Sequence, residues 1–233
     1  MNILVTGASR GIGAAAFALL RSTGHKVIGH STRGNDELIA GDLADPEAPR
    51  KLWDAAFDRF DGRIDALVNN AGVYEAVDAS APDGEWHAAW DRTLRINLQA
   101  PADLSRLAVA HFRQHGGGRI VNVVSRAAFR GDSPQHWHYA ASKAALVAMT
   151  RTIARGYAAE NILAFGVAPG FTVSEMTEDY LRGRGGALIV ADIPLGRVAS
   201  TDEVAESIRW LAVDAPPSAT GSIIDVNGAS YVR

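Results

Sequence analysis

Short apolar runs alternate with longer segments of helical periodicity along almost the whole chain of 233 residues. Most runs are continuously apolar, which is typical of strands covered on both faces. Strand followed by helix, repeated over the full length, predicts a parallel sheet between two helical layers. Because such crossovers are right-handed, we expect a doubly wound, seven-stranded α/β sheet of the Rossmann type. The runs are Ile3–Val5, Val27–Gly29, Leu38–Ala40, Ala66–Asn69, Arg119–Val124, Leu163–Val167 and Ser222–Val226.

The helical segments have recognisable beginnings and ends. In the first, apolar residues from Ile12 to Leu20 recur at i, i+3, i+4 and i+7, and Gly24 follows as a stop signal. Thr201 precedes two acids, the pattern of an N-cap with negative charge in the first turn. Further helices are expected to open near Pro46 and to cover Asp83–Asn97, Pro101–His115, Tyr139–Ala159 and Thr201–Val213.

Nothing in the sequence divides the chain into parts. We find no internal repeat, low-complexity tract or linker, and we expect a single domain over residues 1–233. The least regular stretch, Phe171–Arg197, is rich in glycine and arginine. We expect it to form a mobile substrate flap over the site.

Charge and composition exclude several kinds of protein. The formal net charge is −3, so no basic surplus favours nucleic acid or an anionic membrane. Cysteine is absent, which removes disulfides, thiolate nucleophiles and cysteine zinc sites and suits a reducing compartment. No apolar run approaches the ~18–20 residues of a membrane span, and residues 1–7 do not form a secretion signal. We therefore expect a cytoplasmic enzyme or binding domain.

A glycine-rich turn lies between the first strand and the first helix, with the sequence TGASRGIG at residues 6–13. Gly7 permits a sharp turn, Gly11 permits close approach of a pyrophosphate, and Gly13 permits close packing of helix on strand. The helix N-terminus offers unpaired N–H groups and the positive end of its dipole to phosphates. This strand–turn–helix context predicts a dinucleotide-binding loop.

The end of the second strand indicates which dinucleotide binds. Enzymes that prefer NAD usually place an acid there for the adenosine ribose, and that carboxylate repels a 2′-phosphate. Here the strand runs into His30, Ser31, Thr32 and Arg33, with no acid before residue 36. Arg10 in the glycine loop could reach the same phosphate. Because arginine binds phosphate in a charge-assisted way, we expect NADP(H) rather than NAD(H).

A second group of polar residues has the character of a catalytic site. Tyr139 and Lys143 lie at i and i+4, on one face of an expected helix. Ser125 ends a predicted strand at the carboxyl edge of the sheet, where doubly wound sheets bind ligands. Asn97 ends another predicted segment, and Asn69-Asn70-Ala71-Gly72 follows the fourth strand.

Together these motifs resemble the short-chain dehydrogenase/reductase family over nearly the whole chain. The matches, in order, are the glycine loop, Asp42-Leu43, the NNAG stretch at residues 69–72, Asn97, Ser125, Tyr139 with Lys143, and Pro169-Gly170. The resemblance implies hydride transfer between a nicotinamide and a carbonyl or alcohol.

The resemblance also implies roles for these residues. Tyr139 would be the general acid in reduction, with its pKa of about 10 lowered by the ammonium of Lys143, which would also hold the nicotinamide ribose. Ser125 would orient the substrate oxygen, and Asn97 would fix a water in a proton relay. A plain side-chain-to-backbone bond is the alternative for Asn97. The expected catalytic residues are Asn97, Ser125, Tyr139 and Lys143, with no metal. The expected cofactor-binding residues are Gly7, Ser9, Arg10, Gly11, Ile12, Gly13, Ser31, Thr32, Arg33, Asp42, Leu43, Asn69, Ala71, Gly72, Tyr139, Lys143, Pro169, Gly170, Thr172 and Ser174.

The stretch between Ser125 and Tyr139 departs from the family pattern. It is one residue longer than expected and bulky just before the tyrosine, which affects the shape of the substrate pocket. His136 and His138 lack a third metal ligand, and a solvent-facing loop pair is the favoured interpretation. Trp86 and Trp90, at i and i+4, are expected to form a packing stripe.

Three functions remain open from sequence. The favoured one is an NADP-dependent carbonyl reductase, most similar to 3-oxoacyl-acyl-carrier-protein reductases, which would act on an acyl thioester and contact an acyl carrier protein. Arg126, Arg130, Arg182 and Arg184 could meet that acidic carrier, although arginines on solvated loops are the commoner case. The alternatives are a dehydrogenase of a sugar, polyol or other small secondary alcohol, and a non-catalytic dinucleotide-sensing protein.

Assembly is inferred from resemblance as well. The helices Asp83–Asn97 and Pro101–His115 would pair between subunits, and small residues such as Ala102 and Ala110 permit their close approach. We therefore expect a homotetramer with dihedral symmetry.

Overall fold

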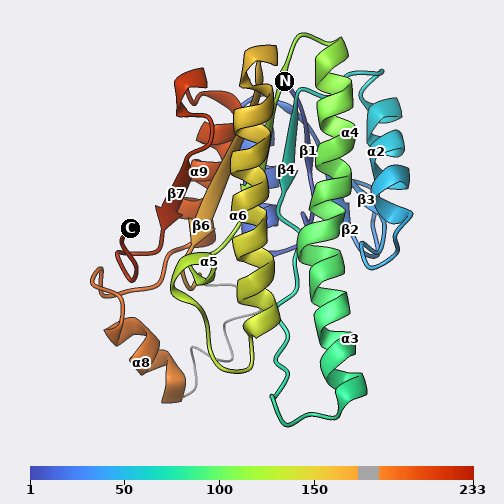
Figure 1. Cartoon of the computed structure of the whole chain (residues 1–233). Coiled ribbons are helices and arrows are strands. Elements are labelled where there is room, and N and C mark those ends of the chain that lie inside the picture. The colour runs from blue at the N-terminus through green and yellow to red at the C-terminus, as the bar shows by residue number, and fades with distance from the viewer. Residues whose placement is uncertain (173–183) are drawn as a thin grey trace.

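Seven parallel strands form one central sheet in the computed structural model, which describes residues 1–172 and 184–233 (Figure 1). The strand order is β3-β2-β1-β4-β5-β6-β7, so the order reverses beside β1. The strands are β1 (Asn2–Val5), β2 (Lys26–Ser31), β3 (Leu38–Ala40), β4 (Ala66–Asn69), β5 (Gly118–Val123), β6 (Ile162–Pro169) and β7 (Ile223–Val226). The predicted doubly wound sheet is confirmed.

Helices cover both faces of this sheet. On the face toward the viewer in Figure 1 lie α2, α4 and α6, and on the opposite face lie α1 and α9. The α-helices are α1 (Gly11–Ser22), α2 (Ala48–Arg59), α3 (Asp83–Leu94), α4 (Ala100–Gln114), α5 (Ala127–Arg130), α6 (Trp137–Tyr157), α8 (Arg184–Ala191) and α9 (Thr201–Val213). A π-helix, η1 (Arg95–Gln99), and two 3-10 turns, η2 (Ala158–Glu160) and η3 (Pro217–Ala219), complete the regular structure of the described residues.

The two largest apolar clusters of the described residues lie between the sheet and its helical layers. Because successive strand residues point to opposite faces, Leu4 of β1 packs in the core under α2 and α4, whereas Ile3 and Val5 pack under α1 and α9. All three side chains are fully buried. This two-sided burial is the physical reason that the central strands are continuously apolar in sequence.

The third and fourth helical segments are one continuous element rather than the two separate helices expected. Residues 83–114 run through α3, η1 and α4 without a break. Pro101 lacks the N–H that an uninterrupted α-helix would require for the carbonyl of Asn97. The wider π-turn at Arg95–Gln99 lies next to this defect, and π-turns are frequent at functional sites.

The last helix has the expected bounds, Thr201–Val213, but its N-cap is one residue earlier than expected. Ser200, not Thr201, is the N-cap of α9: its hydroxyl accepts a hydrogen bond from the Glu203 N–H at 3.2 Å, and the Glu203 carboxylate accepts from the Ser200 N–H at 2.8 Å. This reciprocal capping box satisfies two otherwise unpaired donors. The acids of the first turn are placed as predicted.

Candidate active site

A cleft of about 1580 Å³ opens at the carboxyl edge of the sheet, beside the point where the strand order reverses. The segments that follow β1, β2, β4, β5 and β6 all contribute to its lining. This is where doubly wound sheets bind their ligands. Of the cofactor-binding residues predicted from sequence, every one within the described chain lines the cleft except Asn69. Ser174 lies outside the described residues.

Asn69 is part of the core and not of the cleft. Its amide donates to the Ser105 hydroxyl at 3.2 Å and to the Asn122 side-chain oxygen at 2.9 Å, and Asn122 is its partner across β4 and β5. The next residue, Asn70, lines the cleft instead, and its amide donates to the carbonyls of Thr6 and Gly7 at 3.0 and 3.1 Å. Asn70 therefore holds the glycine loop, a role that sequence reasoning missed although the residue lies within the same motif.

The glycine loop has the geometry that its sequence predicts. Gly7 and Gly11 have positive φ angles of 67° and 56°, which other residues rarely adopt. The N-cap of α1, Arg10, forms no side-chain cap, so the first N–H groups of the helix remain available for a phosphate. A Cβ at Gly13 would collide with the carbonyl of Gly7 and the amide of Asn70.

The tight packing at Gly13 gives a testable result. We expect Gly13→Ala to lower the free energy of unfolding by roughly 1–3 kcal/mol, because the added methyl overpacks the loop, and to abolish detectable NADPH binding. Gly156→Ala is the matched control, since this glycine in α6 has nothing within 4 Å of an added Cβ. It should be neutral or stabilise by up to ~1 kcal/mol. Chemical denaturation and NADPH titration of both variants measure this, and unchanged binding in Gly13→Ala would contradict the packing role.

His30, at the end of β2, holds the glycine loop through a hydrogen bond with Gly7. No role was assigned to it from the sequence. Its Nδ1 accepts from the Gly7 N–H at 3.3 Å, and its Nε2 lies 2.8 Å from the Gly41 carbonyl oxygen. These partners fix a neutral ring with the proton on Nε2. Burial lowers the pKa of His30 below its ordinary 6.5, and the bond to Gly41 and the charge of Asp42 only partly offset this.

Acidification should therefore weaken the fold through His30. Because its pKa is lowered in the folded protein, the unfolded chain takes up a proton first as the pH falls. We expect the melting temperature to fall below about pH 6.5, and to fall less in His30→Gln than in the unchanged protein. The exposed His87→Gln variant is the control and should keep the full pH dependence. Thermal melts between pH 5.5 and 8 test this, and identical curves for His30→Gln and the unchanged protein would disprove it.

The adenosine end of the cleft carries two arginines. Arg10 and Arg33 both line it with exposed side chains, and neither forms a side-chain hydrogen bond or ion pair within residues 1–172 and 184–233. Ser31 and Thr32 lie beside Arg33, and the Ser31 hydroxyl accepts from the Gly34 N–H at 3.0 Å. No carboxylate stands at the end of β2, as predicted.

Ser125, Tyr139 and Lys143 are brought together at the opposite end of the cleft. Ser125 follows β5, whereas Tyr139 and Lys143 lie on one face of α6, packed against the same edge of the sheet. The Lys143 ammonium donates to the Val123 carbonyl at 2.9 Å and lies 5.8 Å from the centre of the Tyr139 ring. Ser125 hydrogen-bonds to the Tyr139 side chain. The predicted serine–tyrosine–lysine group is therefore assembled from two elements distant in sequence.

Burial is the largest influence on the pKa values of Tyr139 and Lys143. It raises the pKa of Tyr139 to about 12, against a smaller lowering effect of the Ser125 hydrogen bond, and it lowers the pKa of Lys143 to about 8. The expectation that Lys143 lowers the pKa of Tyr139 is wrong for this structure, because burial raises that pKa and the Lys143 ammonium donates to the Val123 carbonyl. A phenol that stays protonated at neutral pH is in the state that a general acid requires.

Asn97, in the π-turn, is fully buried and held by the segment after β4. Its side-chain oxygen accepts from the Val73 N–H at 2.8 Å, and its amide donates to the Val73 carbonyl at 3.0 Å and the Ser142 hydroxyl at 3.3 Å. These contacts match the simpler interpretation of side-chain-to-backbone bonding. The water relay through Asn97 stays a prediction.

An aromatic wall borders Tyr139 and had no signal in the sequence. Tyr74 stacks on His136, with ring centroids 3.9 Å apart, and meets the Tyr139 ring edge-on at 4.7 Å. His136 and His138 are buried, so the interpretation as a solvent-facing pair is wrong. His138 lies in the first turn of α6, on its buried side, and His136 is the N-cap residue of that helix. Within the described residues, no group of three or more metal-ligating side chains occurs.

Trp86 and Trp90 form a packing stripe, as expected. Their ring centroids lie 6.0 Å apart, and Trp86 also meets Trp137 of α6 edge-on at 5.4 Å. Neither Trp86 nor Trp90 lines the cleft.

None of the helices within the described part of the chain is long and apolar enough to cross a membrane.

Comparison with known proteins agrees with this geometry. The family model described as enoyl-(acyl carrier protein) reductase matches residues 7–229. The 3-oxoacyl-acyl-carrier-protein reductase FabG of Rickettsia conorii is 35% identical, over 97% of this chain and 94% of the relative. The cis-4-hydroxycyclohexanecarboxylate dehydrogenase of Sinomonas cyclohexanicum is 36% identical, over 97% of this chain and 94% of the relative.

Solved structures give the same result. A candidate gluconate 5-dehydrogenase from Beutenbergia cavernae, with NADP at low occupancy, has a TM-score of 0.87 and 31% identity, covering 98% of this chain and 96% of that one. A candidate 2-deoxy-D-gluconate 3-dehydrogenase from Agrobacterium tumefaciens, with bound NADP, has a TM-score of 0.88 and 28% identity, covering 100% and 96%.

The fold and site define a dinucleotide-dependent oxidoreductase, built on a Rossmann-type sheet with its cleft at the carboxyl edge. The chain belongs to the short-chain dehydrogenase/reductase family and is an NADP-dependent enzyme of that family. Its own residues fit this cofactor: α1 has a free N-terminus, Arg10 and Arg33 suit a 2′-phosphate, and Gly13 leaves room for a closely packed loop.

Proposed function

We propose that this protein reduces a ketone to a secondary alcohol with NADPH, with Tyr139 as general acid. The observation that carries the proposal is the group of buried Ser125, half-buried Tyr139 and buried Lys143 in the same cleft as the glycine loop. A dinucleotide sensor has no evident need for a buried ammonium beside a phenol, because burying an ionisable group costs free energy.

Each residue has a definite task in this reaction. NADPH, when bound, supplies the hydride. The Ser125 hydroxyl donates a hydrogen bond to the substrate oxygen and stabilises the negative charge that develops there. The Tyr139 phenol transfers its proton to that oxygen. The Lys143 ammonium, whose pKa is lowered to about 8, lies near enough to favour the phenolate left behind.

For the substrate we propose a 3-oxoacyl thioester, as the name of the FabG relative indicates. An acyl carrier protein is then the proposed partner. The second candidate is a small secondary alcohol or ketone, of sugar or ring type. It is favoured by the candidate gluconate dehydrogenases among the similar structures and by the relative named for a hydroxycyclohexanecarboxylate.

The absence of cysteine supports a cytoplasmic location.

Substrate-dependent NADPH consumption separates these functions. The probes are the N-acetylcysteamine thioester of 3-oxobutanoate, a neutral diketone, 4-oxocyclohexanecarboxylate and, in the oxidative direction with NADP, gluconate. Turnover of any probe supports the enzyme, and the fastest probe identifies the substrate class. NADPH binding without turnover of any probe would overturn the catalytic proposal in favour of a sensor.

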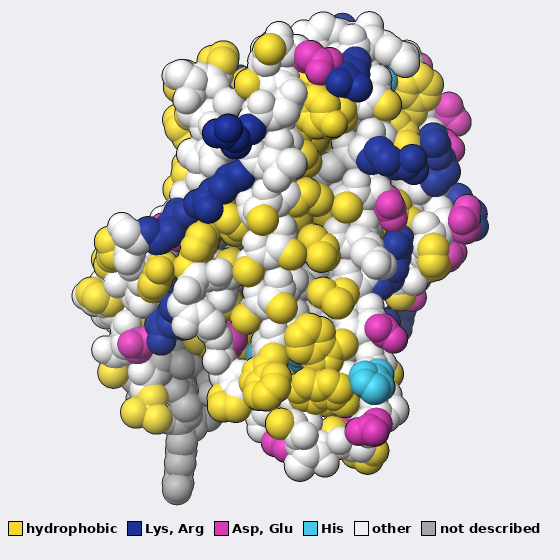
Figure 2. Space-filling view, viewed as in Figure 1, with side chains coloured by type: hydrophobic (Ala, Val, Ile, Leu, Met, Phe, Trp, Pro, Cys, Tyr) yellow, Lys and Arg dark blue, Asp and Glu magenta, His cyan; other side chains and the backbone are white. Residues whose placement is uncertain are grey.

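We also propose a homotetramer that uses the face formed by α3, α4 and α6. Figure 2 shows apolar side chains gathered along this face, and Trp137 at its edge is 52% exposed. A second copy of the chain would cover this surface. We expect light scattering to give about four times the 24.7 kDa chain mass, and Trp137→Asp to shift the distribution toward smaller species. A monomer at micromolar concentration would contradict the proposal.

A further inference from the structure

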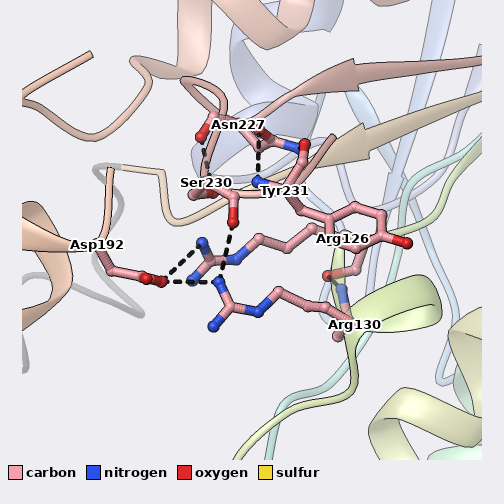
Figure 3. A network of polar contacts seen from close by, with 8 residues as sticks. Arg126, Arg130, Asp192, Asn227, Ser230 and Tyr231 are labelled. Atoms are coloured by element: carbon pink, nitrogen blue, oxygen red, sulfur yellow. Dashed lines mark hydrogen bonds and ion pairs between the residues drawn. The ribbon is translucent and has the colours of Figure 1, made fainter. Parts of the chain in front are cut away.

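Two arginines lie side by side at the rim of the cleft next to the catalytic serine. Arg126 directly follows Ser125, and Arg130 lies one turn further along α5. Both line the cleft that contains Tyr139. Figure 3 shows the two guanidinium groups together, directed toward the carboxylate of Asp192. The interpretation of both residues as arginines on solvated loops does not hold for Arg126, whose side chain is only 11% exposed.

One carboxylate does not satisfy these two cations. Asp192 accepts a hydrogen bond from Arg130 at 2.7 Å, but its nearest approach to Arg126 is 3.8 Å, which is too long for a hydrogen bond. Arg130 also donates to the backbone carbonyl of Ser230 at 3.1 Å. The Nη1 of Arg126 is buried without a hydrogen-bond partner among the described residues.

The remaining surroundings of Arg126 do not neutralise it either. Its guanidinium lies 5.0 Å from the centre of the Phe171 ring, a cation–π contact that supplies no hydrogen-bond acceptor for Nη1. The charge of Asp132 acts on it from a distance, but Asp132 forms no ion pair with Arg126 in the described chain and accepts from Tyr74 and Ser133 instead. Burial and the charge of Arg130 both lower the pKa of Arg126, as expected for an under-compensated cation.

We infer that Arg126, assisted by Arg130, binds a carboxylate of the substrate, so that this enzyme acts on a keto acid or hydroxy acid. Consecutive Cα atoms are about 3.8 Å apart, and Ser125 and Arg126 both line the cleft. The reacting oxygen at Ser125 and an anionic group at Arg126 can therefore belong to one small molecule. A carboxylate suits the free edge of a guanidinium because it accepts two parallel N–H bonds.

This inference rests on the proposed reductase function and, within it, favours the second substrate candidate over the 3-oxoacyl thioester. A small acid that also carries the reacting ketone or alcohol would bind the Arg126 guanidinium through its carboxylate. A neutral thioester would leave Nη1 of Arg126 buried and unpaired. An arginine whose role was only to pack on Phe171 would not distinguish the two.

The test compares matched acids and amides, with 4-oxocyclohexanecarboxylate against its carboxamide and 4-oxopentanoate against its amide as the probes. For at least one pair, we expect kcat/KM of the unchanged enzyme to favour the acid by at least ~30-fold. Arg126→Gln should lose at least ~30-fold on that acid and change less than ~3-fold on its amide. Arg126→Lys, which keeps the charge, should recover part of the loss on the acid, and Arg130→Gln should show a smaller loss.

Controls separate a binding role from a structural one. NADPH affinity should be unchanged in Arg126→Gln, which shows that the fold is intact. Arg113→Gln, at the far end of α4 in an exposed pair with Glu160, should behave as the unchanged enzyme on every probe. Equal turnover of acid and amide by the unchanged enzyme, or equal losses on both in Arg126→Gln, would overturn the inference. In both cases turnover of the amide or of the N-acetylcysteamine thioester would leave the reductase itself established, whereas no turnover of any probe would contradict the proposed function.

Discussion

Replacing Tyr139 by phenylalanine should lower kcat at least ~100-fold while NADPH affinity stays within ~3-fold of its original value. The substitution removes only the phenolic oxygen, which is the proposed proton donor and the partner of Ser125. The ring should keep its place, because it packs edge-on against Tyr74 at 4.7 Å. Steady-state kinetics with the best probe and a fluorescence titration with NADPH measure both quantities.

The tyrosine at the other end of the same helix provides the control. Tyr157 packs beneath the guanidinium of Arg113 at 5.0 Å and does not line the cleft. We expect Tyr157→Phe to leave kcat and NADPH affinity unchanged. If Tyr139→Phe retained the turnover of the unchanged enzyme, the proton would have to come from another group and the proposed mechanism would be wrong.

Replacing both Arg10 and Arg33 by alanine should weaken NADPH binding by about 3–6 kcal/mol, which is roughly 10²–10⁴-fold in Kd. Each guanidinium is expected to make charge-assisted bonds with the 2′-phosphate, and hydrogen bonds to charged groups contribute about 1.5–3 kcal/mol each. NADH has no such phosphate, so its affinity should change less than ~3-fold. Titration of the double variant with both nucleotides tests the assignment.

A double variant elsewhere separates specific contacts from overall charge. Arg50 and Lys51 lie exposed on α2, outside the cleft. Replacing both by alanine removes two positive charges, as many as the Arg10 and Arg33 variant loses. That variant should bind NADPH as the unchanged protein does at physiological ionic strength, because charges beyond about 8–10 Å are largely screened. If the variant with alanine at both Arg10 and Arg33 kept an unchanged preference for NADPH over NADH, other residues would have to recognise the 2′-phosphate.

The local patterns of the chain were enough to predict the sheet and much of the cleft. Strand β6 is apolar throughout, and β4 is apolar up to Asn69, because both faces of these strands are covered; that property can be read directly from the sequence. The glycine loop and the i, i+4 pair of Tyr139 and Lys143 are equally local, since the spacing alone places them on a turn and on one helical face.

Which distant residues a polar side chain hydrogen-bonds to was decided only by the tertiary structure. Asn69 and Asn70 are neighbours in one motif, yet one side chain enters the core to meet Asn122 and the other holds Thr6 and Gly7. Sequence cannot distinguish them, because the face that each residue occupies depends on where β4 ends and on its pairing with β5.

The same reason applies to the residues that sequence reasoning missed or misplaced. His138 is buried because α6 packs against the sheet, and Tyr74 reaches Tyr139 because the segment after β4 passes beside α6. Arg126 is enclosed between Phe171 and Asp192, which lie more than forty residues away along the chain. Short-range periodicity determines which elements form and which face of each is apolar. The burial, pairing and protonation of single polar side chains depend on contacts between distant segments, and only the folded chain brings those segments together.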